Sequence, residues 1–353
     1  MKRGKVKKHA EVKLLLTWYD RHRRVMPWRA GRGEAPDRYR VWLSEIMLQQ
    51  TTVATVGPYF QKFIKRWPTL NSLASAKLDD VLRLWSGLGY YRRARMLHQC
   101  AQRLRDDFGG EFPEDEKTLR TLPGFGPYTA AAVAAIAFGK SANVVDGNVE
   151  RVMSRVFLIT EPLPKAKAKL RDVAATLVPQ KRCGDYAQAL MDLGATVCTP
   201  RSPKCDLCPW RDICLAREKG VSETLPRRTR KKAKPVRRAV AFVLINNKGE
   251  VFLRRRSPHG LLGRMMEVPS SPWREGDIPT LADVRDCAPS AEKWMLCKGL
   301  VRHVFTHFTF EAAVAVAAVK KKIRGHWVLP QELDKEALPS VMKKIVRHAL
   351  IEL

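Results

Sequence analysis

Four cysteines near the middle of the sequence constrain its fold more than any other feature. They lie within seventeen residues and follow the spacing C-x6-C-x2-C-x5-C, as Cys198, Cys205, Cys208 and Cys214. Their sulfurs can converge only if the chain loops tightly, and prolines within the segment favour such a loop. Four cysteine ligands suit either zinc or a [4Fe-4S] cluster. The paired C-x2-C spacing of a zinc ribbon is absent, so the pattern favours the iron–sulfur cluster without excluding zinc.

The remaining cysteines have no comparable spacing. We interpret Cys100, Cys183, Cys287 and Cys297 as isolated thiols. The start of the chain is basic but lacks the apolar stretch of a secretory signal. We therefore expect a cytoplasmic protein with thiols and metal ligands rather than disulfides.

The charge of the chain indicates a polyanionic partner. It carries 65 Lys and Arg against 35 Asp and Glu, a formal net charge of +30. Such an excess favours nucleic acid, with an anionic membrane surface as the second possibility. No apolar run reaches the roughly 18 residues that a membrane-spanning helix needs.

Hydrophobic periodicity divides the chain into domains. A basic tail (1–10) precedes a stretch (11–225) in which apolar residues recur at helical spacing. Residues 226–238 hold eight Lys or Arg among thirteen residues and are interpreted as a linker. Beyond it the period becomes two, with Val240, Phe242 and Leu244 on one face of a strand. A smaller α+β domain is therefore predicted for 239–353.

Several motifs occur in a fixed order along the helical part. A glycine turn, Leu122-Pro-Gly-Phe-Gly-Pro-Tyr-Thr-Ala, is followed by Val144-Val-Asp-Gly-Asn-Val-Glu-Arg-Val and then by the cysteine loop. Together they resemble the helix-hairpin-helix DNA glycosylase superfamily with an iron–sulfur loop. The segments beginning at Trp42 and Gly87, WLSEIMLQQT and GLGYYRRAR, resemble its adenine DNA glycosylase (MutY-type) branch.

This resemblance implies a fold and an activity. The fold would be an all-α helix-hairpin-helix glycosylase domain with a [4Fe-4S] loop, followed by a smaller α+β Nudix-like domain. The activity would be base-excision repair, in which adenine opposite 8-oxoguanine or guanine is flipped out and hydrolysed from double-stranded DNA. We expect a monomer that contacts no membrane and is associated with a bacterial nucleoid.

Two carboxyls are the expected catalytic groups. Glu45 lies in a mostly apolar helical run, where lost solvation would raise its pKa and keep it protonated near neutral pH. By resemblance it protonates N7 of adenine, although a Glu on the polar face of a surface helix would leave the same pattern. Asp146 lies at a predicted helix N-terminus, where it could be a plain cap. The resemblance assigns it to stabilising or capturing the cationic sugar.

Two further residues complete the expected catalytic group. Bifunctional relatives carry a lysine at the hairpin position occupied here by Tyr128. A phenol cannot form a Schiff base, so a monofunctional enzyme that leaves an abasic site is implied. Asn148 is assigned by resemblance as a hydrogen-bonding partner in the site.

The resemblance also implies contacts to DNA. Gly124 and Gly126 permit a tight turn whose backbone N–H groups, with the following helix N-terminus, could bind a phosphate. The other expected contacts probe the base stack or the backbone; they are Gln49, Gln50, Tyr90, Tyr91 and Arg92. Core packing would explain the two tyrosines equally well. Arg29 and Gln188 are candidates for the adenine pocket.

The C-terminal domain carries the expected lesion-reading turn, Phe305-Thr306-His307, in which threonine replaces the serine usual in the family. Considered alone, His307 would be an ordinary histidine of a β domain. The closely spaced glutamates of a magnesium-binding Nudix box are missing, so a Nudix hydrolase is not expected.

Three alternatives remain open at this point. The chain could be an endonuclease III-like glycosylase or a thymine-mismatch glycosylase of the same superfamily. It could also be a non-catalytic iron–sulfur protein that binds DNA. Tyr128, the Gln49–Gln50 pair and the presence of both carboxyls favour the adenine glycosylase.

Overall fold

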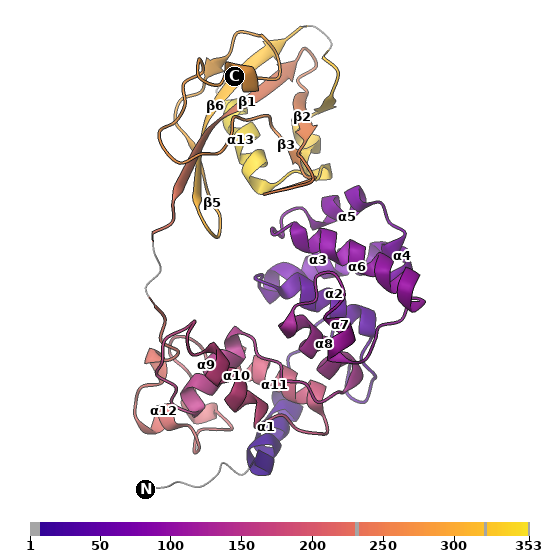
Figure 1. Cartoon of the computed structure of the whole chain (residues 1–353), viewed down its shortest axis with the longest axis vertical. Helices are drawn as coiled ribbons and strands as arrows, with labels where there is room; N and C mark the ends of the chain where they lie inside the picture. Colours follow the sequence, from indigo (N-terminus) through magenta and orange to yellow (C-terminus); the bar gives the residue numbers. More distant parts are fainter. Residues whose placement is uncertain (1–7, 230–232, 321–322, 352–353) are drawn as a thin grey trace. The chain divides into compact units, whose positions relative to one another are not determined.

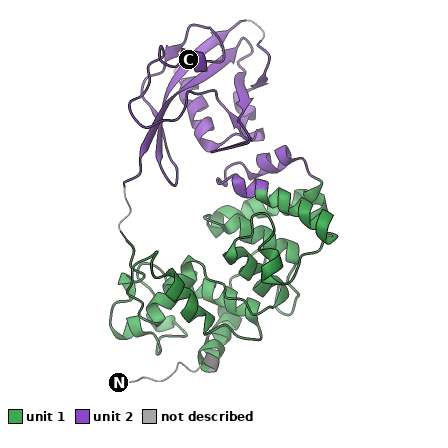
Figure 2. Cartoon of the chain, in the orientation of Figure 1, with its two compact units in different colours: residues 1–75, 96–230 green, residues 76–95, 231–353 purple. Residues whose placement is uncertain are grey.

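The computed structural model describes residues 8–229, 233–320 and 323–351. The chain divides into two compact units, and each unit draws on two separate stretches (Figure 2). Unit 1 comprises residues 1–75 and 96–230, and unit 2 comprises 76–95 and 231–353. Most of the predicted basic tail and residues 230–232 of the predicted linker lie outside the described residues.

Unit 1 is helical. Its helices are α1 (Lys8–His22), α2 (Arg38–Leu48), α3 (Val53–Arg66), α4 (Leu70–Ala74), most of α6 (Arg92–Phe108), α7 (Glu116–Leu119), α8 (Pro127–Phe138), α9 (Gly147–Val156), α10 (Lys167–Ala175), α11 (Cys183–Thr196) and α12 (Leu215–Glu218) (Figure 1). Short polar residues set where several of them begin. Asp37 caps α2 by accepting from the Arg40 N–H, and Thr52 caps α3 by accepting from the Thr55 N–H.

Helix α8 forms the centre of unit 1. Its residues Thr129–Ile136 are buried on every side, as expected for a helix without a polar face. Helices α2 and α11 both pack on α8, and α11 also packs on α1 and α9. A Cβ at Gly184 of α11 would lie 2.7 Å from the carbonyl oxygen of Ala135 in α8. Glycine is therefore required for this close approach, which brings α2, α8 and the start of α9 around one site.

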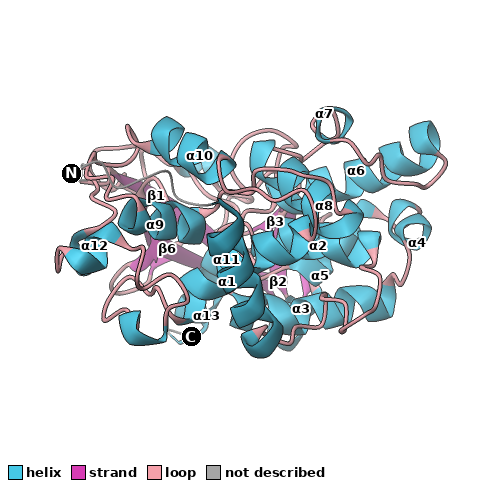
Figure 3. Cartoon of the chain, turned by 90° about the horizontal axis from the view of Figure 1, so that it is seen from below, coloured by secondary structure: helices cyan, strands magenta, loops and turns pink. Residues whose placement is uncertain are grey.

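Unit 2 contains a mixed sheet and two helices. Its strands are β1 (Val236–Asn246), β2 (Val251–Arg255), β3 (Met266–Glu267), β4 (Met295–Leu296), β5 (Val301–Val304), β6 (Thr309–Val319) and β7 (His326–Val328) (Figure 3). The order is β3-β2-β1-β6-β4, with β5 beside β6 and β7 beside β2. The long strands β1 and β6 run parallel, in register from Val236–Thr309 to Asn246–Val319. Helix α13 (Ser340–Ile351) packs on the sheet, and α5 (Leu78–Trp85) is the second helix.

Both faces of the central strand β1 are buried, whereas the alternating pattern in its sequence suggested that only one face would be buried. Ala239, Ala241 and Val243 face the core formed with α13. Val240, Phe242 and Leu244 pack in smaller clusters on the opposite face. A turn that begins at Asn246 joins β1 to β2 as an antiparallel hairpin.

The observed units differ from the predicted boundaries in two ways. Strand β1 begins at Val236, inside the predicted linker, and the residues before the gap are anchored to unit 1. There the Leu163 N–H donates to the carbonyl of Arg227 and the Thr229 N–H donates to the carbonyl of Leu163. Residues 76–95 belong to unit 2, where Arg255 pairs with Asp79 at 2.8 Å. Within 8–229, 233–320 and 323–351, no helix has both the length and the apolar character needed to cross a membrane.

Candidate active site

Glu45 and Tyr128 form the centre of the site. Glu45 lies on α2, is 6% exposed, and accepts a hydrogen bond of 2.9 Å at Oε2 from the Tyr128 hydroxyl of α8. Burial raises the pKa of Glu45 to about 7, and the negative charge of Asp146 acts in the same direction. The Tyr128 hydrogen bond and the positive charge of Arg29 oppose this shift. A carboxyl with this pKa can hold a proton at neutral pH and deliver it to a bound base.

Asp146 is the N-cap of α9, as its position in the sequence predicted. Its Oδ1 accepts from the backbone N–H groups of Asn148 and Val149, at 2.9 and 2.8 Å. Its Oδ2 accepts from Nδ2 of Asn148 at 2.7 Å. These donors fix the orientation of the carboxyl group, so Asn148 acts on the site through Asp146.

A half-buried link through Arg151 joins Asn148 to the cysteine loop, and the sequence motifs gave no sign of it. Arg151 donates from Nη2 to Oδ1 of Asn148 at 2.9 Å and from Nε to the carbonyl of Cys198 at 2.7 Å. It also donates to the carbonyl of Gly194 on α11. The cysteine loop and Asn148, the partner of Asp146, are therefore held by the same guanidinium group.

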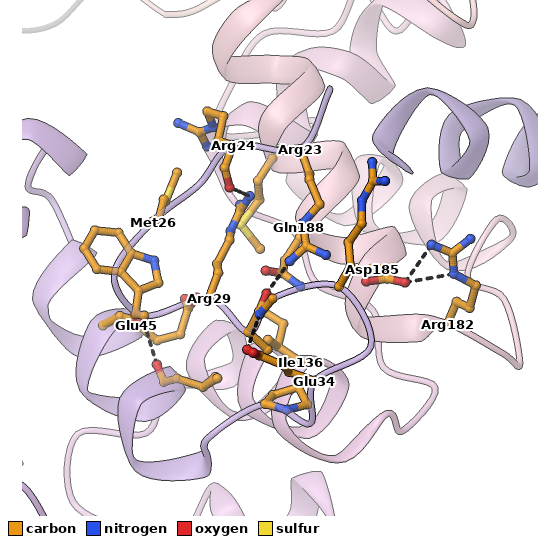
Figure 4. A pocket seen from close by; sticks show the side chains of 18 of the residues that line it. Arg23, Arg24, Met26, Arg29, Glu34, Glu45, Ile136, Arg182, Asp185 and Gln188 are labelled. Atoms are coloured by element: carbon orange, nitrogen blue, oxygen red, sulfur yellow. Dashed lines mark hydrogen bonds and ion pairs between the residues drawn. The ribbon is translucent and has the colours of Figure 1, made fainter. Parts of the chain in front are cut away.

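A cavity of about 420 Å³ opens beside Glu45, within the roughly 300–1,000 Å³ typical of small-ligand sites. Arg29 and Gln188, the two candidates for the adenine pocket, line this cavity together with Glu45 (Figure 4). Trp28 and Met191 add apolar wall to the same cavity. The cavity therefore combines apolar side chains with a few polar groups, as small-ligand sites usually do.

The glycine turn leads into a helix N-terminus without a side-chain cap. Gly124 adopts a φ of +82°, which L side chains rarely accept, and its missing Cβ leaves room for Met96. Gly126 is the N-cap of α8 and supplies no side chain to bind the first N–H groups of the helix. The first N–H groups of α8 after Pro127 therefore have no side-chain cap, as an anion site at a helix N-terminus requires.

The four cysteines surround one cavity at the end of unit 1. Arg155, which is 1% exposed, donates from Nη1 to Sγ of Cys198 at 3.2 Å, and its other donors bind backbone carbonyls. A buried cation directed at this sulfur fits a ligating thiolate. Across the described ranges, no three His, Cys, Asp or Glu side chains close tightly enough to hold a single ion.

The expected DNA contacts in unit 1 lie next to the hairpin. Gln49 ends α2 and donates from Nε2 to Oγ1 of Thr129 at 3.0 Å. Gln50 follows it, exposed and with a φ of 58°. A positive φ lies outside the right-handed helical region, so Gln50 is not part of the helix.

Of the two adjacent tyrosines in unit 2, Tyr90 lies at the surface and Tyr91 lies in the core. Tyr90 is 42% exposed, whereas Tyr91 is 6% exposed and packs as the core aromatic that the sequence also allowed. Arg92 is exposed, but Arg93 is buried between the rings of Trp85 and Tyr90. Of the arginines at 92 and 93, only Arg92 can reach a phosphate without unpacking unit 2.

The predicted lesion-reading segment forms the turn between β5 and β6. The Phe305 N–H donates to the carbonyl of Phe308, which closes the turn, and the two rings stack 4.7 Å apart. Thr306 and His307 are exposed at its tip. Oγ1 of Thr306 is hydrogen-bonded to the hydroxyl of Tyr90, so two expected contact residues meet within unit 2.

A helical hairpin, a buried Glu with a Tyr donor, and a four-cysteine loop together define a base-excision DNA glycosylase. Residues 43–178 match the family model of the HhH-GPD superfamily base excision DNA repair proteins. Residues 198–214 match the iron–sulfur binding domain of endonuclease III, and 240–348 match the NUDIX domain. The predicted class of enzyme, fold and [4Fe-4S] cofactor are thereby confirmed.

Individual known proteins show to which family within the superfamily the chain belongs. The human adenine DNA glycosylase is 34% identical, over 94% of this chain and 72% of its own length. That of Buchnera aphidicola subsp. Schizaphis graminum is 33% identical, over 94% of this chain and 96% of its own. A solved thermostable thymine-DNA glycosylase is 35% identical with a TM-score of 0.54, over 60% of this chain and 97% of that chain. The chain belongs to the adenine DNA glycosylase family.

Proposed function

We propose that this chain excises adenine mispaired with 8-oxoguanine or guanine and leaves an intact strand with an abasic site. The observation that carries the proposal is the buried Glu45, held by Tyr128 beside a cavity of about 420 Å³ that has room for a flipped base. Asp146, fixed at the cap of α9, supplies the second carboxyl. Two carboxyls in different environments are the arrangement that glycosidic cleavage requires.

The chemistry follows from these positions. Protonated Glu45 donates its proton to N7 of the flipped adenine, and the C1′–N9 bond breaks with its electron pair passing to N9. Asp146 stabilises the positive charge that develops on the sugar, and water adds at C1′. Tyr128 orients Glu45 and, being a phenol, cannot attack the sugar to form an imine. The cluster, when bound, orders the cysteine loop to which Arg151 and Asn148 connect the cap.

The opposite base would be read in unit 2. The exposed turn at Thr306 and His307, with the Tyr90 hydroxyl bonded to Thr306, supports this assignment. Thr306→Val should lower discrimination between 8-oxoguanine and guanine partners, while Thr306→Ser should retain it. Equal discrimination in the valine variant would remove Thr306 from the reading of the lesion.

The proposal includes a monomer acting on nucleoid DNA. The net charge of +30 supports attraction to duplex DNA, and close relatives occur in bacteria. Light scattering on the free chain and on its duplex complex tests the stoichiometry. A 2:1 complex would contradict the monomer.

The deciding experiment is single-turnover base release from duplexes holding A opposite 8-oxoguanine, A opposite G, T opposite G, or A opposite T. Products are resolved before and after alkali. Release of adenine from the first two, with strand breaks only after alkali, is expected. Release of thymine would favour the mismatch relative, and breaks without alkali would indicate a lyase.

Point variants test the two carboxyls. Glu45→Gln and Asp146→Asn should each abolish adenine release while retaining binding to the lesion duplex, because neither side chain is needed for phosphate contact. Retained release in either variant would contradict the role assigned to that residue. Asp107→Asn, a change at an exposed surface ion pair, is the control.

A further inference from the structure

Asp192 is a buried carboxylate next to the adenine pocket, and nothing in the motifs pointed to it. It lies on α11 and is 0% exposed. An ionised group in such a place needs partners, because burying a charge without them is costly. Two arginines from the loop after α1 supply those partners.

Arg29 binds Asp192 through a two-pronged ion pair. Its Nη1 donates to Oδ2 at 2.7 Å and its Nη2 to Oδ1 at 2.9 Å. This planar geometry fixes the guanidinium group more firmly than a single bond would. The Arg29 side chain is itself only 8% exposed, so solvent does not screen the pair.

Arg24 closes the other side of the same carboxylate. Its Nε donates to Oδ1 at 2.6 Å and its backbone N–H to Oδ2 at 3.1 Å. The Arg24 carbonyl in turn accepts from Nη1 of Arg29 at 3.2 Å. Asp192 therefore fixes both the side chain of Arg29 and the backbone of the loop that carries it.

Arg29 reaches the catalytic acid by its charge. It lines the same cavity as Glu45 (Figure 4), and its positive charge lowers the pKa of Glu45 against the larger effect of burial. The other groups that act on Glu45 are Tyr128 on α8 and Asp146 at the cap of α9. Arg29 is thus the cation that favours loss of the catalytic proton.

Three of the five N–H groups of Arg29 are used by Asp192 and the Arg24 carbonyl. The Nε–H and one Nη2–H remain for a ligand in the cavity, where ring nitrogens of adenine are acceptors. An Arg29 that turned to Glu45 would give up this orientation and stabilise the ionised carboxyl. Asp192, as the partner of Arg29, therefore affects both the binding of the base and the transfer of a proton from Glu45 to the base.

We infer that Asp192 is a positioning residue for base release: it fixes the guanidinium of Arg29 in the pocket wall and offsets its positive charge beside Glu45. The inference rests on the proposed function, because it presumes that Glu45 is the acid. Asp192 touches neither the base nor the sugar. It acts through Arg29.

The test is the pH dependence of single-turnover adenine release by Asp192→Asn, measured in the full-length, cluster-loaded protein. The basic limb of the profile should move to lower pH by roughly one unit, so that the rate falls about ninefold at pH 8 but only about twofold at pH 6. Asp107→Asn removes the same formal charge from an exposed pair and should leave the limb in place. An unmoved limb in Asp192→Asn would overturn the inference.

A double variant separates positioning from simple damage to the fold. Asp192→Asn leaves Arg29 without its counter-ion and is expected to destabilise the chain. Adding Arg29→Met removes that cation, so the limb should return towards the wild-type pH even though the maximal rate stays low. A limb that remains shifted in the double variant would overturn the inference as well. Circular dichroism and the cluster absorbance of each variant verify folding.

Failure of the proposed function would look different. If Glu45→Gln still releases adenine, the assignment of the acid is wrong whatever Asp192 does. If Glu45→Gln is inactive and Asp192→Asn has the wild-type limb, only the role of Asp192 fails.

Discussion

At the scale of single residues, the proposed mechanism makes Glu45 the group that sets the pH range of the enzyme. In that mechanism Glu45 acts in its protonated form, and burial raises its pKa to about 7. The protonated fraction is therefore nearly complete at pH 5.5 and falls as pH rises through 7. Single-turnover release should decline about tenfold per pH unit above that point. A rate that stays flat to pH 9 with saturating enzyme would contradict this assignment.

Because Glu45 is buried, its ionised form lowers the free energy of unfolding above neutral pH. Its folded pKa of about 7 exceeds the ordinary value of 4.5, so its ionisation opposes folding increasingly between these two pH values. Glu45→Gln should therefore stabilise the chain at pH 8 by up to about 3 kcal/mol, with little gain at pH 4.5. Urea unfolding at both pH values measures the difference.

The control for this prediction is Glu161→Gln, a change at an exposed glutamate of unit 1. Its effect should be small and alike at both pH values. A Glu45→Gln variant with no extra stability at pH 8 would mean that the carboxyl is solvated in the free protein.

At the scale of helices, Gly194 sets how closely α11 approaches the catalytic cap. A Cβ there would lie 2.6 Å from Cβ of Asn148, a distance that real structures do not show. Gly194→Ala must displace Asn148 and with it the hydrogen bond to Asp146. We expect adenine release to fall roughly 10- to 100-fold, measured in single turnover, with duplex binding retained.

Gly57 in α3 provides the matched control. A Cβ at Gly57 meets nothing within 4 Å, so Gly57→Ala should preserve the rate. It should also raise stability by up to about 1 kcal/mol, since alanine favours a helix over glycine. Equal rates for the two alanine variants would show that the approach of α11 does not matter for release.

Site residues that lie in local sequence motifs could be predicted from the sequence. Residues whose role depends on packing between helices could not. Glu45, Tyr128 and Asp146 stand in motifs whose spacing sets their local roles, and the fold around them was predicted correctly. Asp192 and Arg151 have no such signal, because their partners lie on other helices and meet only after α11 packs on α8 and α9. The sequence placed residues 76–95 in the helical domain, although they belong to unit 2. Hydrophobic periodicity predicts that a helix has an apolar face, but it does not show in which hydrophobic core that face is buried.

At the scale of the whole molecule, the charge of +30 makes DNA binding sensitive to salt. Binding to an undamaged duplex should weaken along a steep linear plot of log affinity against log salt. About six phosphate contacts would reduce affinity on the order of 10³-fold between 50 and 200 mM salt. Fluorescence anisotropy gives the slope, and single-turnover release at saturating enzyme should change far less. A shallow slope would mean that the cations are spread over surfaces that DNA does not touch.

Because α5 belongs to unit 2, cleavage of the chain between the helical part and the C-terminal part should not separate the two units. A protease site engineered between residues 229 and 233 would cut the chain once, yet unit 2 would then consist of two polypeptides. The 76–95 segment would stay covalently joined to the helical part, while its partners, including Arg255, would belong to the released part. The two fragments should therefore co-purify after cleavage and reassociate after separation, as complementing halves rather than independent domains.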